Sequence, residues 1–310
     1  PVLVFRWRLF IFLPSLIEYT TGVQMSILIA GQVLNGFATG MLYAMVGVGL
    51  TLVLGVLNIP NFAHGTLYAF GAYFTFTVAN WTDSFYLGVL IGPLLVVLMG
   101  FVIESQGVRR LYGAHHDYQL LFLFAIALIL QETVILIWGP VGFSLLPPKN
   151  LTGGVDLGFI VYPKYRLALM LFTATLVVAL YLLMTRTIVG AILRAGIENR
   201  EMVKVLGINI NKVFLFTFGL GAYLAGLAGA LSTPIWGLTP SMGLDILPIC
   251  FVIVVIAGLG SILGAIGAGI IIGLAQSLTT IWWPEASNVV IYFMMGLVII
   301  FRPQGLFGSR

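Results

Sequence analysis

The chain has 310 residues, of which 14 are Lys or Arg and 10 are Asp or Glu, so charged residues make up only 8% of it. Soluble globular proteins carry about 25% charged residues. A chain with 60% hydrophobic residues and a mean hydropathy of +1.12 lacks the polar surface of a water-soluble globule. The net charge of +4 does not indicate a nucleic-acid-binding protein, because the basic residues are scattered among apolar runs.

The apolar runs lack the alternation of membrane β-strands and predict an all-α polytopic membrane protein, with a single transmembrane domain over residues 1–310. At about 20 residues per span, the chain accommodates about 8–10 transmembrane helices, including broken or re-entrant ones. Residues 1–24 form an N-terminal extension, expected to be a short first helix. Residues 25–57 are too long for one straight span and must tilt strongly, bend or break. The later apolar runs are 66–79, 85–103, 118–138, 167–184, 213–231, 246–259, 262–278 and 289–301.

Three of these runs carry small residues at every fourth position. Small residues on one face let helix backbones approach closely where hydrophobicity cannot drive association in lipid. We therefore expect tight helix packing at three sets of residues: Gly36, Gly40 and Ala44; Gly221, Ala225 and Gly229; and Ala265, Gly269 and Gly273.

Residues 58–65 place polar and helix-breaking residues between two apolar runs, including Asn58, Pro60, Asn61 and His64. Proline removes an amide donor and disfavours helix at the preceding residue, while asparagine can bond free backbone groups. Two readings stand. The segment is either a broken helix lining a wet cavity, as is common at transporter sites, or an ordinary polar turn at the membrane surface.

Glu132 falls in the middle of the run 118–138, where a carboxylate costs several kcal/mol unless it faces water or a partner. We expect it to be functional, the alternative being a Glu held neutral or bonded to a neighbouring helix. His64 lies beside an apolar run and could carry a proton, but no second histidine or carboxylate stands at ligand spacing, so no metal site is predicted. The single cysteine, Cys250, excludes an internal disulfide.

The connection 186–212 has the densest basic group in the chain and is predicted to be cytoplasmic. Span counting puts Arg109, Arg110, Arg302 and Arg310 on the same side, and puts Lys149, Lys164 and Arg166 outside. Within the connection, charges three or four apart and an opposite apolar face predict a short amphipathic helix that ends at Gly207 and suits the groove of a soluble partner. Its residues are Arg194, Ala195, Glu198, Glu201, Met202, Lys204, Leu206 and Gly207. The alternative is a solvated connector.

The stretch 258–264 superficially suggests a phosphate-binding loop, but no Lys-Ser or Lys-Thr follows it and it separates two apolar runs. ATP binding by this chain is therefore not expected. Ser261 would need a base to act as a nucleophile, and no histidine follows His116. These features argue against an enzyme.

Several segments resemble the permease subunit of ABC importers for branched-chain amino acids, a family that also includes urea and short-amide permeases. The resemblance extends over nearly the whole chain from about Gln32. The matching segments, in chain order, are 35–44, 49–51, 61–65 (Asn-Phe-Ala-His-Gly), 194–209, 258–264 (Gly-Leu-Gly-Ser-Ile-Leu-Gly) and 301–308 (Phe-Arg-Pro-Gln-Gly-Leu-Phe-Gly).

This resemblance implies a bacterial inner-membrane assembly of two permease subunits, two cytoplasmic ATPase subunits that hold ATP and Mg, and an extracytoplasmic solute-binding protein. The segment 194–209 would then couple to the ATPase. Asn58, Asn61, His64 and Glu132 are the residues expected along or beside the translocation path. The expected solute is a small hydrophobic amino acid, and urea or a short amide is the alternative. A stand-alone secondary transporter or channel, or a membrane scaffold, would lack these partners.

Overall fold

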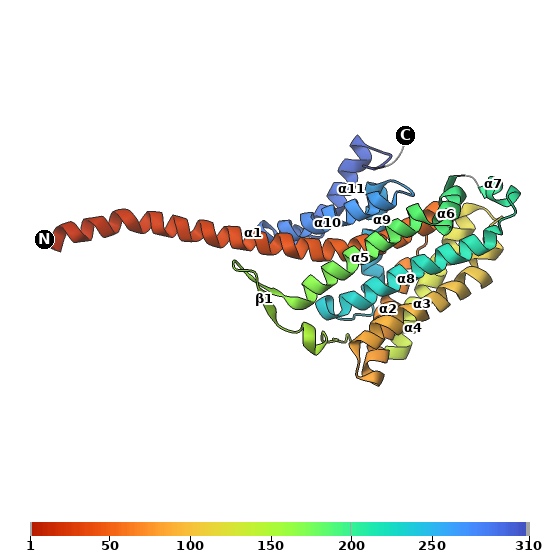
Figure 1. Ribbon diagram of the computed structural model, residues 1–310, viewed down its shortest axis with the longest axis horizontal. Coiled ribbons are helices and arrows are strands. Elements are labelled where there is room, and N and C mark those ends of the chain that lie inside the picture. The colour runs from red at the N-terminus through yellow and green to blue at the C-terminus, as the bar shows by residue number, and fades with distance from the viewer. Residues whose placement is uncertain (1, 199, 308–310) are drawn as a thin grey trace.

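The protein is described here by a computed structural model that covers residues 2–198 and 200–307, with side chains described for 24–196 and 202–307. It is built almost entirely of helices (Figure 1). The elements are α1 (Val2–Leu57), α2 (His64–Thr82), α3 (Phe85–Gln106), η1 (Val108–Leu111), α4 (His116–Trp138), η2 (Lys149–Leu151), β1 (Gly154–Asp156), β2 (Val161–Pro163), α5 (Lys164–Arg186), α6 (Ile188–Glu198), α7 (Arg200–Val205), α8 (Ile210–Trp236), α9 (Met242–Ala257), α10 (Ile262–Trp282), η3 (Pro284–Ala286) and α11 (Val289–Phe301).

The core is formed by the second half of α1 packed against α10 and α8, with α2 and α3 packed against α8. In the described part of the chain, six helices are long and apolar enough to cross a membrane: α1 from Gln24, α3 with η1, α4, α5, α8 and α10. The helices α2, α9 and α11 are shorter. The predicted all-α polytopic membrane fold is therefore confirmed.

Helix α1 is continuous from Val2 to Leu57, so the expected separate first helix within residues 1–24 is wrong. From Gln24 to Leu57 the helix has 34 residues, which at 1.5 Å per residue is about 50 Å, well beyond a hydrocarbon core of about 30 Å. The interruption comes after this long helix, at Asn58, and not within it. No residue inside the helix forces a break, because residues 25–57 contain no proline.

The predicted small-residue faces of α1 and α10 lie directly against each other. A Cβ added at Gly36 would lie 2.8 Å from the Leu274 Cα, and one added at Gly40 would lie 2.8 Å from the Ile270 Cα. Gly269 and Gly273 in turn lie against the α1 backbone at Ala44 and Gly40. The two backbones are in direct contact, as the spacing predicted.

Helix α8 uses its own small residues to contact two neighbours at once. Gly221 lies against Gly49 of α1, where an added Cβ would be 3.0 Å from the carbonyl oxygen. Gly229 lies against the Tyr68 carbonyl of α2, and Ala225 between them is fully buried. The small-residue face of α8 therefore fixes both helices that flank the 58–63 interruption.

Two of the segments that carry the family resemblance meet at the end of α9. The Leu306 amide donates to the Ile256 carbonyl at 2.7 Å, and Phe307 packs over Gly264 and Gly267. Ser261, considered above as a nucleophile, instead caps α10: its hydroxyl accepts a hydrogen bond from the Gly264 amide at 3.1 Å. The glycine-rich stretch is thus a helix junction covered by the C-terminal segment.

The basic residues separate to opposite ends of the bundle. Tyr112, just after Arg109 and Arg110, packs edge-on against Phe214 at 4.8 Å, next to the connection 186–212. The β1–β2 hairpin and the start of α5, which carries Lys164 and Arg166, lie at the other end of α5 from α6 (Figure 1). For Arg109 and Arg110 at one end and Lys164 and Arg166 at the other, this separation matches the one that span counting predicts, whereas Arg310 lies outside the described residues.

A valine at Gly40 should disrupt the α1–α10 contact, because its side chain would have to displace backbone atoms. Overpacking of this kind typically costs about 1–3 kcal/mol. We expect Gly40→Val to lower the melting temperature of the purified protein, measured by size-exclusion chromatography after heating. Gly296→Val in α11 is the matched control, because nothing lies within 4 Å of a Cβ added there. Equal melting temperatures for the two variants would contradict this packing.

Candidate functional site

The interruption between α1 and α2 is a tight turn over residues 58–63. The Asn58 amide still donates to the Leu54 carbonyl at 2.8 Å, but Asn58 itself has a left-handed backbone with φ of 55°. Asparagine adopts this conformation more readily than most residues. The Asn61 side-chain oxygen then accepts from the Ala63 amide at 3.1 Å, and α2 begins at His64. The sequence Asn-Ile-Pro-Asn thus ends one helix and starts the next.

Three residues of this turn, Ile59, Asn61 and Ala63, are buried, whereas Asn58 is exposed. Asn61 is 1% exposed and His64 is fully buried. The His64 ring nitrogen Nε2 lies 3.0 Å from the Val46 carbonyl oxygen, which ties α2 back onto α1. The other ring nitrogen of His64 and the side-chain nitrogen of Asn61 have no hydrogen-bond partner within the described residues. Unpartnered buried polar atoms are costly and mark places where the structure can change.

Asn58 is exposed and opens onto a cavity of about 170 Å³. The cavity lies between the turn and the start of α4, and its lining includes Tyr112, His116 and Gln119. Of the predicted path residues, the structure thus brings Asn58, Asn61 and His64 together in one turn.

Glu132 does not join them. It is exposed on the outer face of α4 and lines none of the three cavities described in this article, whereas its neighbour Gln131 is buried and donates to the Pro240 carbonyl. The place of Glu132 along the translocation path stays a prediction. Periodicity alone could not assign the carboxylate to a face of an almost uniformly apolar helix.

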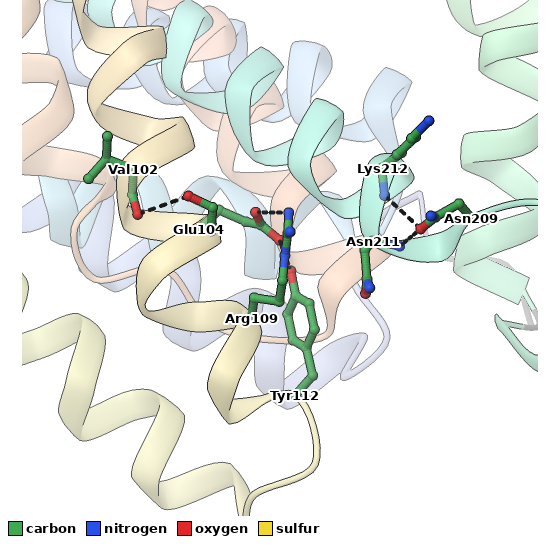
Figure 2. Close-up of polar contacts among 8 residues, drawn as sticks. Val102, Glu104, Arg109, Tyr112, Asn209, Asn211 and Lys212 are labelled. Atoms are coloured by element: carbon green, nitrogen blue, oxygen red, sulfur yellow. Dashed lines mark hydrogen bonds and ion pairs between the residues drawn. The ribbon is translucent and has the colours of Figure 1, made fainter.

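A buried carboxylate near the turn, Glu104, was missed by the sequence analysis. It lies at the end of α3 with 0% exposure and pairs with Arg109, Nη2 to Oε2 at 2.8 Å and Nε to Oε1 at 3.3 Å. The Tyr112 hydroxyl donates to Oε1 at 2.6 Å. Figure 2 shows this cluster beside the first turn of α8. The sequence signal for this ion pair was a Glu at the end of an apolar run, followed five residues later by an Arg.

The helix predicted over 194–207 falls on α6 and α7, which lie on either side of Asn199. Helix α6 begins earlier, at Ile188, and ends at Glu198, and α7 covers Arg200–Val205. Asn199 between them lies outside the described residues, as do the side chains of Glu198 and Glu201.

The predicted stop at Gly207 is confirmed. Gly207 has φ of 76°, its amide donates to the Lys204 carbonyl at 2.9 Å, and the Ile208 amide reaches back to the Val203 carbonyl at 3.3 Å. This is the Schellman pattern that ends helices at glycine. Beside it, Met202 and Leu206 are 58% and 69% exposed.

The inner side of the same connection contacts the helices next to the turn. Gly196 of α6 faces Val56 of α1 and Val213 of α8, whose methyl groups would lie 3.8 and 3.9 Å from an added Cβ. Val56 comes two residues before Asn58. The edge-on contact of Tyr112 with Phe214 adds a second link, from α8 to the cavity lined by Asn58. Helix α6 therefore contacts α1 just before the turn, and α8 packs against both α1 and α2, which flank the turn.

Comparison with known proteins identifies the family of this chain. Residues 32–299 match the family model described as branched-chain amino acid transport system / permease component. The chain belongs to this family. This permease chain is 29% identical to the high-affinity branched-chain amino acid transport system permease protein BraD of Pseudomonas aeruginosa over 89% of this chain and 95% of that one.

The permease proteins LivH and LivM of the Escherichia coli high-affinity branched-chain amino acid transport system are also similar to it. LivH is 29% identical over 89% of this permease chain and 94% of its own, and LivM is 28% identical over 86% and 68%. Among solved structures, PsaBC from Streptococcus pneumoniae in complex with Fab matches with a TM-score of 0.48 and 14% identity, over 94% of this chain and 97% of that one.

Substitutions in the Glu104 cluster of this permease should lower the free energy of unfolding by different amounts, depending on which charged group loses its partner. Arg109→Gln leaves a buried carboxylate without its partner, which typically costs about 3–5 kcal/mol. Glu104→Gln leaves an arginine whose side chain is 35% exposed and can reach water, so we expect a smaller loss. Melting temperatures of the purified variants measure this order, with Arg110→Gln as the exposed control. The reverse order would contradict the burial of Glu104.

Proposed function

We propose that this permease chain is the membrane subunit of an ATP-driven importer that moves a small hydrophobic amino acid into the bacterial cytoplasm. An extracytoplasmic binding protein delivers the solute. A second, homologous permease subunit completes the path, and two cytoplasmic ATPase subunits, which hold ATP and Mg, drive it by alternating access. The connection 186–212 and the C-terminus face the cytoplasm. The printed names of BraD, LivH and LivM support the solute class, and the likeness to both LivH and LivM supports a paired permease.

The observation that carries the proposal is the two-sided packing of the connection 186–212. On its outer side, Met202 and Leu206 are exposed to solvent. Exposed apolar side chains next to charged ones are typical of a surface that binds a partner. Its inner side touches Val56 and Val213 next to the 58–63 turn. A soluble subunit that grips the outer side would therefore push on the helices that bound the turn.

A stand-alone secondary transporter fits these features less well. Coupling to an ion gradient needs ionisable groups that can change charge inside the membrane. The buried carboxylate Glu104 is already neutralised by Arg109. The exposed Met202 and Leu206 would also have no role in a transporter that works alone.

Uptake into liposomes tests the proposal. The permease is reconstituted with its cognate ATPases, partner permease and binding protein, and ATP-dependent uptake of radiolabelled leucine is measured with excess valine, urea or acetamide as competitor. Valine should compete, whereas urea and acetamide should not. ATP-dependent uptake of labelled urea or acetamide without uptake of labelled leucine would favour the short-amide alternative, and leucine uptake without ATP would favour a secondary transporter.

Aspartate at Leu206 should weaken ATPase binding, because it places a charge on the apolar surface that the partner covers. We expect Leu206→Asp to lose co-purification of the ATPase subunits and ATP-dependent uptake while the permease still inserts. Val161→Asp is the matched control, since Val161 is 66% exposed but lies at the other end of α5. Full ATPase co-purification with Leu206→Asp would contradict docking at this surface.

A further inference from the structure

Two adjoining cavities lie at the end of the bundle opposite to α6 and α7. One has a volume of about 270 Å³ and the other about 200 Å³, and both are lined by Tyr43 and Trp236, whose ring centroids are 6.0 Å apart. We name them the polar cavity and the apolar cavity. Arg166, which lines the polar cavity, is in the first turn of α5, and at 1.5 Å per residue it lies about 30 Å from the start of α6. The cavities are thus separate from the 58–63 turn.

The polar cavity contains a guanidinium group with no anionic partner. Arg166 is half-buried and donates to the Asn35 side-chain oxygen, which also accepts from the Tyr162 hydroxyl at 3.2 Å. No described carboxylate is close enough to Arg166 to form an ion pair. Arginine has five N–H donors in a planar fork that matches a carboxylate, and Asn35 accepts from one of them.

The other polar groups of this cavity largely satisfy one another. The Tyr43 hydroxyl donates to Gln276 at 2.9 Å, Gln276 donates to Asn288 at 2.9 Å, and the Ser277 hydroxyl donates to Gln32 at 2.7 Å. Arg166 is the single charged residue among the described residues that line the cavity. An incoming ligand would therefore be recognised by its negative charge.

The apolar cavity has the opposite character. Its walls include Met242, Ile246 and Ile249 beside the two shared aromatic rings, and its charged residue is Asp245. The Asp245 carboxylate accepts from the Ser241 hydroxyl at 3.0 Å, and no described basic group is within ion-pair distance of it. The two cavities together therefore offer a cation, an apolar wall and an anion, in that order across Tyr43 and Trp236.

We propose that these joined cavities are a solute-binding site of the permease itself, built for a zwitterionic amino acid. The solute carboxylate binds Arg166, and its apolar side chain packs on Tyr43 and Trp236 and reaches into the apolar cavity. The ammonium group is on the same carbon as the carboxylate and therefore stays in the polar cavity. Together the cavities reach the size of small-molecule sites, roughly 300–1,000 Å³. This inference rests on the proposed function, because it names the solute class that the permease accepts. Urea and acetamide lack the carboxylate and would bind weakly.

Protection of a cysteine in the polar cavity tests this site directly. Thr39 lines it, so Thr39→Cys is made in a Cys250→Ala background, and the purified permease–ATPase complex is labelled with a maleimide without binding protein. Leucine and 4-methylpentanoate should slow labelling. The uncharged 4-methylpentanamide should need about a tenfold or higher concentration, because hydrogen bonds to a charged group contribute about 1.5–3 kcal/mol. Equal protection by the acid and the amide overturns the proposal.

A matched pair of variants identifies the residue responsible. Arg166→Gln should raise the concentration of leucine that gives half-protection by about tenfold or more, whereas Lys164→Gln, which removes the same charge two residues away, should not change it. An unchanged value in Arg166→Gln, or an equal rise in both variants, overturns the assignment. If the Arg166→Gln complex does not assemble, the comparison of 4-methylpentanoate with 4-methylpentanamide in the complex that keeps Arg166 still tests the proposal. ATP-dependent leucine uptake without protection at Thr39→Cys would reject this site and leave the proposed function standing.

Discussion

Direct backbone contact between α1 and α10 is the constraint on which the rest of the structure depends. Because Gly36, Gly40, Gly269 and Gly273 have no side chains, the two helices approach until their backbones touch. Hydrophobicity cannot supply this specificity in lipid, where every apolar face is equally satisfied. The contact fixes one long helix in the centre of the bundle, and that helix carries residues of both functional regions.

Helix α1 connects the two ends of the protein as a rigid element. Tyr43 lines the polar and apolar cavities, and Val56 touches α6. Val56 comes 13 residues after Tyr43, which corresponds to about 20 Å of unbroken helix. The turn at residues 58–63 is where this rigidity ends. Its buried Asn61 and His64 each keep a polar atom without a partner among the described residues. A displacement of α6 would reach the turn through Val56 and Val213 without deforming α1.

The features predicted correctly from the sequence are those set by local spacing. The small residues at every fourth position predicted the α1–α10 contact and the contacts of α8. Pro60 and the nearby asparagines predicted the end of α1, and Gly207 predicted the end of a helix. The sequence did not reveal which face of a helix is covered. Helices α3 and α4 are apolar all round, so the sequence does not reveal that Glu104 is buried against Arg109 or that Glu132 is exposed. The polar cavity around Arg166 also could not be predicted from the sequence, because its lining comes from α1, α5 and α10, which are far apart in the chain.

The central claim is that the buried 58–63 turn opens when the ATPase subunits act on α6 and α7. Labelling of a cysteine at Asn61, in a Cys250→Ala background, with a small water-soluble thiol reagent tests this most directly. Asn61 is 1% exposed in the structure, so labelling should be slow at rest. It should accelerate severalfold when ATP, solute and binding protein are supplied to the reconstituted complex. A cysteine that stays inaccessible in every nucleotide state would show that the turn is a static structural element.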